Sequence, residues 1–528
     1  MTRQGQRGER MARFSAWATP RRVVQAALLA LFVYLLSLAR WPLSEAVLTN
    51  AFLSLDPLLS LQAAIAGRTW VPALIYGIAL LAATVLLGRF FCGWMCPMGT
   101  LIEWSDDLVF GRGRRRVKKN HERIGRGVKY GVLLVILIAA AFGEGLAYLA
   151  DPICWATRLF AYVVWPVAGT LAVAASNLLR PVFEALGWMN LARAEITPPV
   201  FGPFGVVALL FFIGVVALGR WQRRFWCRSL CPLGALLALA ARFTWFHRKV
   251  AAHCTAEGKC SRVCETGAIG EDYTRYDPAE CIQCGSCAKS CHTGAVTFAP
   301  GLGGAAKDPR VDLSRRAATF WLAGGAVAAT WIVRDPMRLT PGDELLRPPG
   351  ALPENDFLAT CVRCGQCVKA CPTHMLQSTA LAGGVAGFMS PTARMRLGPC
   401  DQNCTACGGV CPTGAIRVLD LVEKTYAKIG NAVIEPGRCV VWEQGRVCLV
   451  CDEHCPYGAI DWKEVDGERR PQVNENKCNG CGACEHACPV DGRSAIRVFP
   501  AGQIRLAVGS YADEAALRGL ILEDRPPG

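Results

Sequence analysis

Histidine is scarce in this sequence, and a nucleotide-binding glycine fingerprint is missing. Only 7 of the 528 residues are histidine, and none lies inside an apolar run. A membrane haem with two axial histidines is therefore disfavoured. No glycine fingerprint follows a predicted strand, which argues against direct binding of a nicotinamide dinucleotide. The basic cluster at 112–126 lacks interleaved aromatic residues, so it predicts membrane topology and no nucleic-acid partner.

Cysteine, in contrast, is abundant. The chain has 28 cysteines, a mean hydropathy of +0.26 and a formal net charge of +15. Many of the cysteines follow the spacing C-x-x-C-x-x-C-x-x-x-C, which is typical of iron–sulfur ligation and not of a disulfide framework. The length and the apolar bias together predict several domains, some of them in a bilayer.

Five apolar runs are about as long as a bilayer crossing requires, at 23–39, 71–88, 130–149, 204–219 and 317–333. Basic residues are concentrated in the N-terminal segment and in every second connection between the apolar runs. This pattern predicts a bacterial inner-membrane protein with a cytoplasmic N-terminus. A further apolar stretch, 160–176, would place Arg220, Arg223 and Arg224 outside if it crossed. We therefore expect 155–180 to be an interfacial or re-entrant element that Pro166 breaks.

Two similar motifs, RFFCGWMCPMGT and RRFWCRSLCPLGA, each follow an apolar run. The topology places both at the cytoplasmic face, so Cys92, Cys96, Cys227 and Cys231 are expected to converge. Cysteines four residues apart share one face of a helix. Three interpretations stay open: ligands of one more metal cluster, a redox dithiol or copper site, and packing at a helix end.

A ferredoxin-like cytoplasmic module is expected at 250–310. In two-cluster ferredoxins the last cysteine of each run joins the other cluster, so the first ligand set comprises Cys264, Cys281, Cys284 and Cys287. The second set has only three thiolates, from Cys254, Cys260 and Cys291, because Glu257 occupies the remaining ligand position. This set predicts either a [3Fe–4S] cluster or a [4Fe–4S] cluster with an oxygen ligand from Glu257.

Sixteen cysteines near the C-terminus fall into four runs, which predict four [4Fe–4S] clusters. The runs comprise Cys361, Cys364, Cys367 and Cys371; Cys400, Cys404, Cys407 and Cys411; Cys439, Cys448, Cys451 and Cys455; and Cys478, Cys481, Cys484 and Cys488. Two exchange patterns of the last cysteine stay open: sequential (first with second, third with fourth) and nested (first with fourth, second with third).

The segment at 312–334 resembles a twin-arginine signal through Ser314, Arg315 and Arg316, and we interpret it as a retained anchor helix. It places 335–528 in the periplasm. The expected fold is a membrane α-helical bundle plus α+β ferredoxin-like iron–sulfur domains. Its parts are a membrane domain at 1–249, the cytoplasmic two-cluster module at 250–310, the anchor at 312–334 and the periplasmic four-cluster polyferredoxin at 335–528.

Residues 20–300, with RFFCGWMCP and RRFWCRSLCP, resemble the NapH family of membrane quinol dehydrogenase subunits. Residues 312–500 are similar to the MauM/NapG family of exported ferredoxins. The resemblance implies a fusion that oxidises the membrane quinol pool and passes electrons to a periplasmic reductase or c-type cytochrome. Other membrane subunits are further candidate partners.

Two other functions stay open. One is a maturation or regulatory polyferredoxin, a metal or thiol reductase that supports assembly of a copper-dependent enzyme. The other is reverse electron flow into quinone. Trp155 and Arg158 are candidates for the quinone site on the outer side, although an interfacial anchor is the simpler interpretation of each. Cys154 is expected to be a buried structural thiol.

Overall fold

The five apolar runs of the sequence all form helices in the computed structural model, as expected. These helices are α2 (Ala18–Leu38), α5 (Leu74–Leu87), α8 (Val128–Ala141), α12 (Pro203–Leu218) and α16 (Arg315–Val333). Two of them, α5 and α8, are shorter than predicted. Gly88 ends α5 because its φ of 75° is a conformation that glycine adopts without a steric cost. The structure describes residues 18–43, 48–110, 126–189, 202–270, 273–301, 315–333, 345–380 and 383–522.

Within these ranges, two helical stretches are long and apolar enough to cross a membrane, Pro20–Leu38 and Pro152–Ala185. The second corrects the expectation that Pro166 breaks the segment. Helix α9 (Pro152–Leu159) continues through the π-turn η3 (Phe160–Val164) into α10 (Trp165–Ala185). The wide π-turn lies directly before Pro166, where the ring of a proline would clash with an ordinary helical turn. The helix therefore accommodates Pro166 and continues past it.

The chain divides into two compact units. Unit 1 comprises Met1–Leu35, Ala51–Phe160 and Val206–Thr330, and unit 2 comprises Leu36–Asn50, Ala161–Gly205 and Trp331–Gly528. The ferredoxin-like module of residues 246–300 thus belongs to the same unit as most of the apolar helices.

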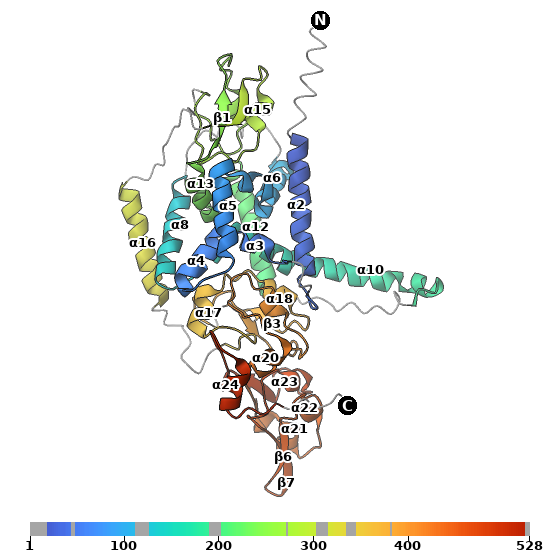
Figure 1. The fold of residues 1–528 in the computed structure, drawn as a ribbon. Helices are drawn as coiled ribbons and strands as arrows, with labels where there is room; N and C mark the ends of the chain where they lie inside the picture. Colours follow the sequence, from blue (N-terminus) through green and yellow to red (C-terminus); the bar gives the residue numbers. More distant parts are fainter. Residues whose placement is uncertain are drawn as a thin grey trace. The chain divides into compact units, whose positions relative to one another are not determined.

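Unit 1 has a helical core in which α4 (Pro57–Gly67), α5, α8 and α13 (Pro232–Ala241) pack against one another (Figure 1). Small residues allow the close approach. A Cβ at Gly77 of α5 would lie 2.8 Å from the Cα of Pro57 at the start of α4. Unit 1 also contains α6 (Pro97–Phe110) and the short elements α3 (Ala51–Ser54), η1 (Phe91–Met95), η2 (Ala147–Leu149) and η4 (Trp226–Leu230).

The ferredoxin-like module joins an antiparallel strand pair to two one-turn helices. Strand β1 (Phe246–Val250) pairs with β2 (Val296–Pro300), so the ends of the module meet. The helices α14 (Lys259–Arg262) and α15 (Ser286–Ser290) carry cysteines into a small core around Tyr276. Thiols occupy much of this interior, which is the arrangement that a cluster-binding domain requires.

Unit 2 contains the C-terminal cysteine runs on short elements. Its strand pairs are antiparallel: β3 (Leu376–Ser378) with β4 (Pro391–Ala393), β5 (Asn431–Ile434) with β8 (Ile496–Phe499), and β6 (Ile460–Val465) with β7 (Glu468–Val473). Its helices are α17 (Glu354–Thr360), α18 (Gln366–Ala370), α19 (Ala406–Gly409), α20 (Leu421–Tyr426), η5 (Pro436–Arg438), α21 (Val440–Gln444), α22 (Val450–Glu453), α23 (Ala483–Ala487) and α24 (Tyr511–Leu517). Cysteines and apolar side chains such as Met375, Met395 and Ile496 share one core. A core of thiols and apolar side chains is what the predicted ferredoxin-type domains require.

Candidate iron–sulfur centres

The two Cys-x-x-x-Cys-Pro motifs adopt the same local structure. Each forms a π-turn, η1 or η4, followed by an extended cysteine and a new helix that begins at proline. Cys96 has φ −62° and ψ 117°, and Cys231 has φ −69° and ψ 112°. The expectation that each pair shares one face of a single helix is therefore wrong. The helical region is disfavoured for a residue before proline, which agrees with the extended conformation of the second cysteine in each motif.

The four cysteines of these motifs converge in unit 1, and we call them the cysteine quartet: Cys92, Cys96, Cys227 and Cys231. Burial raises the pKa of the Cys96 thiol, and the nearby Cys92 and Cys227 raise it further. Burial likewise raises the pKa of the Cys231 thiol, with contributions from Cys227, Cys92 and Cys96. Backbone N–H groups point at two of the sulfurs, from Gly99 to Cys96 Sγ (3.4 Å) and from Gly234 to Cys231 Sγ (3.2 Å).

One arginine precedes each motif, and its side chain crosses to the other motif. A Cβ at Gly234 in the second motif would lie 3.0 Å from Arg89 Nη2. In return, Arg224 Nη1 donates to the carbonyl of Cys92 in the first motif (3.3 Å). Both guanidinium groups are buried, with about 1% of each residue exposed. Two cations thus flank four thiols, which favours the negative charge that metal-bound thiolates carry.

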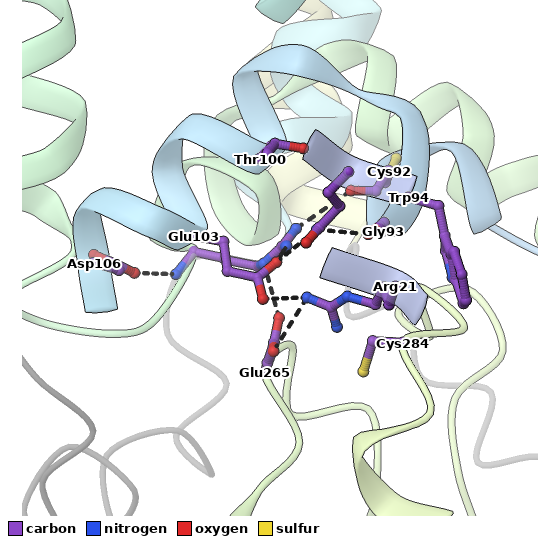
Figure 2. A network of polar contacts seen from close by, with 12 residues as sticks. Arg21, Cys92, Gly93, Trp94, Thr100, Glu103, Asp106, Glu265 and Cys284 are labelled. Carbon is purple, nitrogen blue, oxygen red and sulfur yellow. Dashed lines mark hydrogen bonds and ion pairs between the residues drawn. The ribbon is translucent and has the colours of Figure 1, made fainter. Parts of the chain in front are cut away.

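Carboxylates hold these arginines in place. Glu103 on α6 accepts hydrogen bonds from Arg224, Arg21 and Gln25 (Figure 2). Burial raises the pKa of Glu103, but Arg224 and Arg21 outweigh that effect and hold it at about 2. Glu265 of the ferredoxin-like module pairs with Arg224 (3.0 Å) and Arg21 (3.5 Å). The network therefore ties the helical core to the module within unit 1.

A second contact joins the module to the first motif. Arg89 Nη1 donates to the carbonyl of Ala279 (2.7 Å) and lies 3.4 Å from Glu280. Trp94 Nε1 donates to the carbonyl of Gln283 (3.0 Å), and a Cβ at Gly93 would lie 2.2 Å from the carbonyl oxygen of Ile282. The loop between Cys281 and Cys284 therefore packs directly on the turn that carries Cys92.

Within the module, the structure brings the predicted ligands together in the predicted sets. Burial raises the pKa of Cys281, and Cys287, Cys284 and Cys264 add to the shift. Burial raises the pKa of Cys260, and Cys254 and Cys291 are among the contributing neighbours.

Glu257 is exposed at the edge of the three-cysteine set. Its carboxylate pairs with Lys259 (2.9 Å) and His292 (2.8 Å). Glu257 would lose its ion pairs with Lys259 and His292 if its carboxylate bound iron. The type of cluster at Cys254, Cys260 and Cys291 stays a prediction.

In unit 2, the last cysteine of each of the first two runs lies near cysteines of the other run, as ligand exchange would require. Burial raises the pKa of Cys367, and Cys364, Cys361 and Cys411 raise it further. Burial also raises the pKa of Cys407 and Cys404, and both have Cys400 and Cys371 as neighbours. We call these groups set 1 and set 2. Set 1 comprises Cys361, Cys364, Cys367 and Cys411, and set 2 comprises Cys371, Cys400, Cys404 and Cys407.

The last two runs exchange in the same way. Set 3 comprises Cys455, Cys478, Cys481 and Cys484, and the burial-raised pKa of Cys484 has the other three among its contributing neighbours. Set 4 comprises Cys439, Cys448, Cys451 and Cys488, which line a small pocket together with apolar side chains. The arrangement favours sequential over nested pairing. Sets 2 and 3 adjoin, because the N–H of Cys400 donates to the carbonyl of Cys481 (2.8 Å).

These thiols fit an iron–sulfur cluster better than a single metal ion. Among the described residues, no three His, Cys, Asp or Glu side chains gather closely enough to hold one metal ion. The cysteines are nevertheless neighbours, and backbone N–H groups approach sulfurs in several sets, including Cys264 and Cys455 (3.2 Å each). N–H donors to sulfur suit the thiolate ligands of an iron–sulfur cluster.

The outer candidates Trp155 and Arg158 are buried in unit 1 and are not exposed interfacial anchors. Arg158 lies 4.7 Å from the Trp155 ring and donates to the carbonyl of Tyr148 (2.9 Å). Trp155 stacks on Phe211 with ring centroids 3.7 Å apart. Cys154 is fully buried. The cation and the ring thus stabilise the start of α9 internally.

Sequence reasoning missed Arg89, Arg224 and their carboxylate partners. A signal exists in the duplicated pattern R-F-[FW]-C-x-x-x-C-P-x-G, in which the arginine and the glycine repeat along with the cysteines. The partners Glu103, Glu265 and Glu280 carry no comparable signal, because they come from separate segments that only the fold brings together.

Comparison with known proteins agrees with this geometry. The 4Fe-4S binding domain family Fer4_5 matches residues 69–118 and 201–252, which contain the two halves of the cysteine quartet. The 4Fe-4S dicluster domain family Fer4_7 matches residues 360–415, which contain the first two runs, and residues 446–491, which contain the last two runs except Cys439. No solved structure matches the chain.

Several curated proteins are similar to part of the chain. A methylamine utilization ferredoxin-type protein MauM from Methylorubrum extorquens is 41% identical over 163 residues, which are 29% of this chain and 72% of the relative. The MauM of Paracoccus denitrificans is 36% identical over 201 residues, covering 37% and 87%. The ferredoxin-type protein NapG of Escherichia coli is 36% identical over 179 residues, covering 31% and 75%. The chain is an iron–sulfur electron-transfer polyferredoxin and belongs to the family of MauM/NapG ferredoxin-type proteins.

Proposed function

We propose that the chain is a membrane protein that oxidises quinol and passes the electrons through its polyferredoxin to a periplasmic reductase or c-type cytochrome. The observation that carries this proposal is the union, in one polypeptide, of a helical unit with paired Cys-x-x-x-Cys-Pro motifs and a four-set polyferredoxin. Quinol is apolar and resides in the bilayer, so its oxidation needs apolar helices and one-electron acceptors in the same molecule. The two long apolar stretches, Pro20–Leu38 and Pro152–Ala185, support membrane association.

The row of ligand sets supports electron transfer along unit 2. Sets 1 and 2 both take cysteines from the run that contains Cys367 and Cys371. Set 2 adjoins set 3 through Cys400 and Cys481. Sets 3 and 4 are connected because the last cysteines of their runs, Cys455 and Cys488, each lie in the other run's set. When bound, [4Fe–4S] clusters supply one-electron carriers. The chain's own contribution is to bury the thiols, to direct N–H groups at the sulfurs and to keep successive sets adjacent.

The cysteine quartet is proposed as the ligand set of one further [4Fe–4S] cluster. Its four thiols converge, Arg89 and Arg224 offset their negative charge, and the matching family is a 4Fe-4S binding domain. The loop between Cys281 and Cys284 lies on the same turn, so this centre adjoins the ferredoxin-like module. We expect the quartet to exchange electrons with that module.

The test is reduction of the purified, cluster-loaded protein by a water-soluble quinol in detergent without oxygen, followed by EPR. We expect signals of reduced clusters that match part of the signal obtained with dithionite. If dithionite reduces the clusters and no quinol does at any ratio of quinol to quinone, the proposed dehydrogenase function is wrong. That outcome would favour the maturation function, for which loss of the protein should deplete a copper centre in its partner.

A further inference from the structure

A pocket lies in unit 2 between helices from the apolar half of the sequence and the first cysteine runs. Its cavity volume is about 60 Å3, and it opens to the surface. One wall comes from η3, α10 and the first residues of α12, through Tyr162, Trp165 and Phe204. The other wall comes from α18 and β3, through Lys369 and Gln377.

Polar groups gather at one end of this pocket. Tyr162 Oη and Ser378 Oγ share a hydrogen bond of 2.8 Å. Gln377 donates from its amide to the carbonyl of His374 (3.0 Å), and its Oε1 lies 3.3 Å from where a Cβ on Gly202 would stand. Hydroxyl, amide and imidazole groups therefore face one small space, as a ligand with oxygen substituents on a ring would require.

The ammonium of Lys369 already has protein partners. It donates to the carbonyls of Leu36, Ser37 (3.3 Å) and Ala39 (3.1 Å) at the end of α2, and it lies 4.2 Å from the centre of the Trp165 ring. These contacts of the Lys369 ammonium hold the α18 side of the pocket in place. Recognition of a ligand is left to Tyr162, Gln377 and their neighbours.

The polar end adjoins two of the ligand sets. A Cβ at Gly365 would lie only 2.3 Å from Tyr162 Oη, and Gly365 belongs to the loop between Cys364 and Cys367 of set 1. Val368 and Lys369 line the pocket from α18, which connects Cys367 of set 1 to Cys371 of set 2. A molecule in the pocket is therefore separated from the first two sets by one short stretch of backbone.

The other end of the pocket continues onto an apolar surface. Trp165, Pro166 and Phe204 line it, and exposed apolar side chains follow along α10 at Val167 (45% exposed) and Leu171 (64% exposed). An exposed apolar stripe of this kind suits contact with lipid or with a hydrocarbon tail. A ligand with a polar ring and an apolar tail matches both ends.

We infer that this pocket binds the ring of a membrane hydroquinone, with the quinol oxygens at Tyr162, Gln377 and His374, the ring beside Trp165 and the tail along α10. This inference rests on the proposed quinol oxidation and assigns it a place in the chain. The hydroquinone becomes a quinone by losing two electrons and two protons. The electrons pass one at a time to oxidised [4Fe–4S] centres at sets 1 and 2, and the protons leave to water through the open mouth.

Binding is tested without turnover. An azido-substituted quinone is irradiated with the purified full-length protein, and the labelled peptides are identified by mass spectrometry. We expect label on 161–166 or 369–378, and competition by unlabelled quinone. Label confined to other segments contradicts the site, and label on all apolar helices in proportion to their exposure would mean detergent-phase binding only, which also contradicts it.

The variants Gln377→Leu and Tyr162→Phe test recognition, and Tyr426→Phe is the matched control outside the pocket. Loss of a hydrogen bond to the ligand should slow quinol reduction of the clusters by about tenfold, while reduction by dithionite and the iron content stay as in the wild type. Tyr426→Phe should leave both rates unchanged. If the wild type is reduced by quinol and both pocket variants match it, this site is wrong and quinol oxidation stands. If the wild type is not reduced at all, the proposed function itself fails.

Discussion

The cysteine quartet of unit 1 and the four sets of unit 2 use the same ligand in different settings. The quartet stands at two junctions between a π-turn and a helix, and buried arginines and carboxylates surround it. The sets of unit 2 stand on short loops whose turns contain glycines with positive φ, such as Gly365 and Gly482. Backbone N–H groups point at sulfur in both settings, from Gly99 and Gly234 in the quartet and from Ala459 in unit 2. The quartet in addition has two buried arginines, Arg89 and Arg224, beside its thiols.

The largest expected effect comes from removing one quartet ligand. Cys231→Ser should lower the iron content by about four atoms per chain and leave the EPR signals of unit 2 unchanged, because the quartet is a separate ligand set. Cys154→Ser, which alters another fully buried thiol of unit 1, should keep all the iron. Equal iron content in Cys231→Ser and the wild type would show that the quartet holds no cluster.

The second expected effect is on the thermal stability of unit 1, where buried ion pairs surround the quartet. Glu103→Gln leaves Arg21 and Arg224 without their shared carboxylate, and loss of one partner of a buried ion pair costs about 3 kcal/mol. We expect a lower thermal midpoint for unit 1 by scanning calorimetry. The exposed Glu443→Gln is the control and should change nothing measurable.

This stabilisation should also depend on pH in a defined direction. The pKa of Glu103 is held at about 2, below its usual value of 4.5, after Arg224 and Arg21 outweigh the effect of burial. A depressed pKa stabilises the folded state fully above about pH 4.5 and loses that contribution as the pH falls toward 2. The stability difference between the wild type and Glu103→Gln should be constant from pH 8 to pH 5. A steady decline across that range would contradict the assignment.

A smaller effect should appear in the reduction potential of the quartet. Arg89→Gln removes a buried cation beside Cys92 and Cys231, which disfavours the extra electron. The potential of this centre should fall by roughly 60 mV for each 1.4 kcal/mol of lost interaction, as measured by potentiometric EPR titration. The potentials of unit 2 should not move, and neither should any potential in Arg180→Gln, which alters an exposed arginine of α10. An unchanged quartet potential would contradict the role of the arginine.

The smallest effect concerns the three-cysteine set of the module. Oxidised wild-type protein should give the EPR signal of a three-iron cluster, since Glu257 is engaged with Lys259 and His292. Glu257→Cys supplies a fourth thiolate and should remove that signal. A wild-type protein without any three-iron signal would favour oxygen ligation by Glu257.

The sequence predicted the five apolar helices and the cysteine sets of the module because those features repeat locally. It left the pairing of the C-terminal runs open, since sequential and nested exchange use the same residues. The fold distinguishes them, for example by the approach of Cys411 to Cys361 and Cys367. It was wrong about Pro166, because the π-turn that accommodates the ring has no sequence signature. The pocket was not predictable, since Tyr162 and Ser378 are 216 residues apart in the chain.

The central claim is that quinol delivers electrons to the row of sets in unit 2. Rapid freeze-quench EPR of the fully oxidised protein mixed with quinol tests it most directly, with Cys231→Ser beside the wild type. We predict that the clusters of unit 2 are reduced first and equally fast in both proteins. Reduction that begins in unit 1 and is lost in Cys231→Ser would contradict the account.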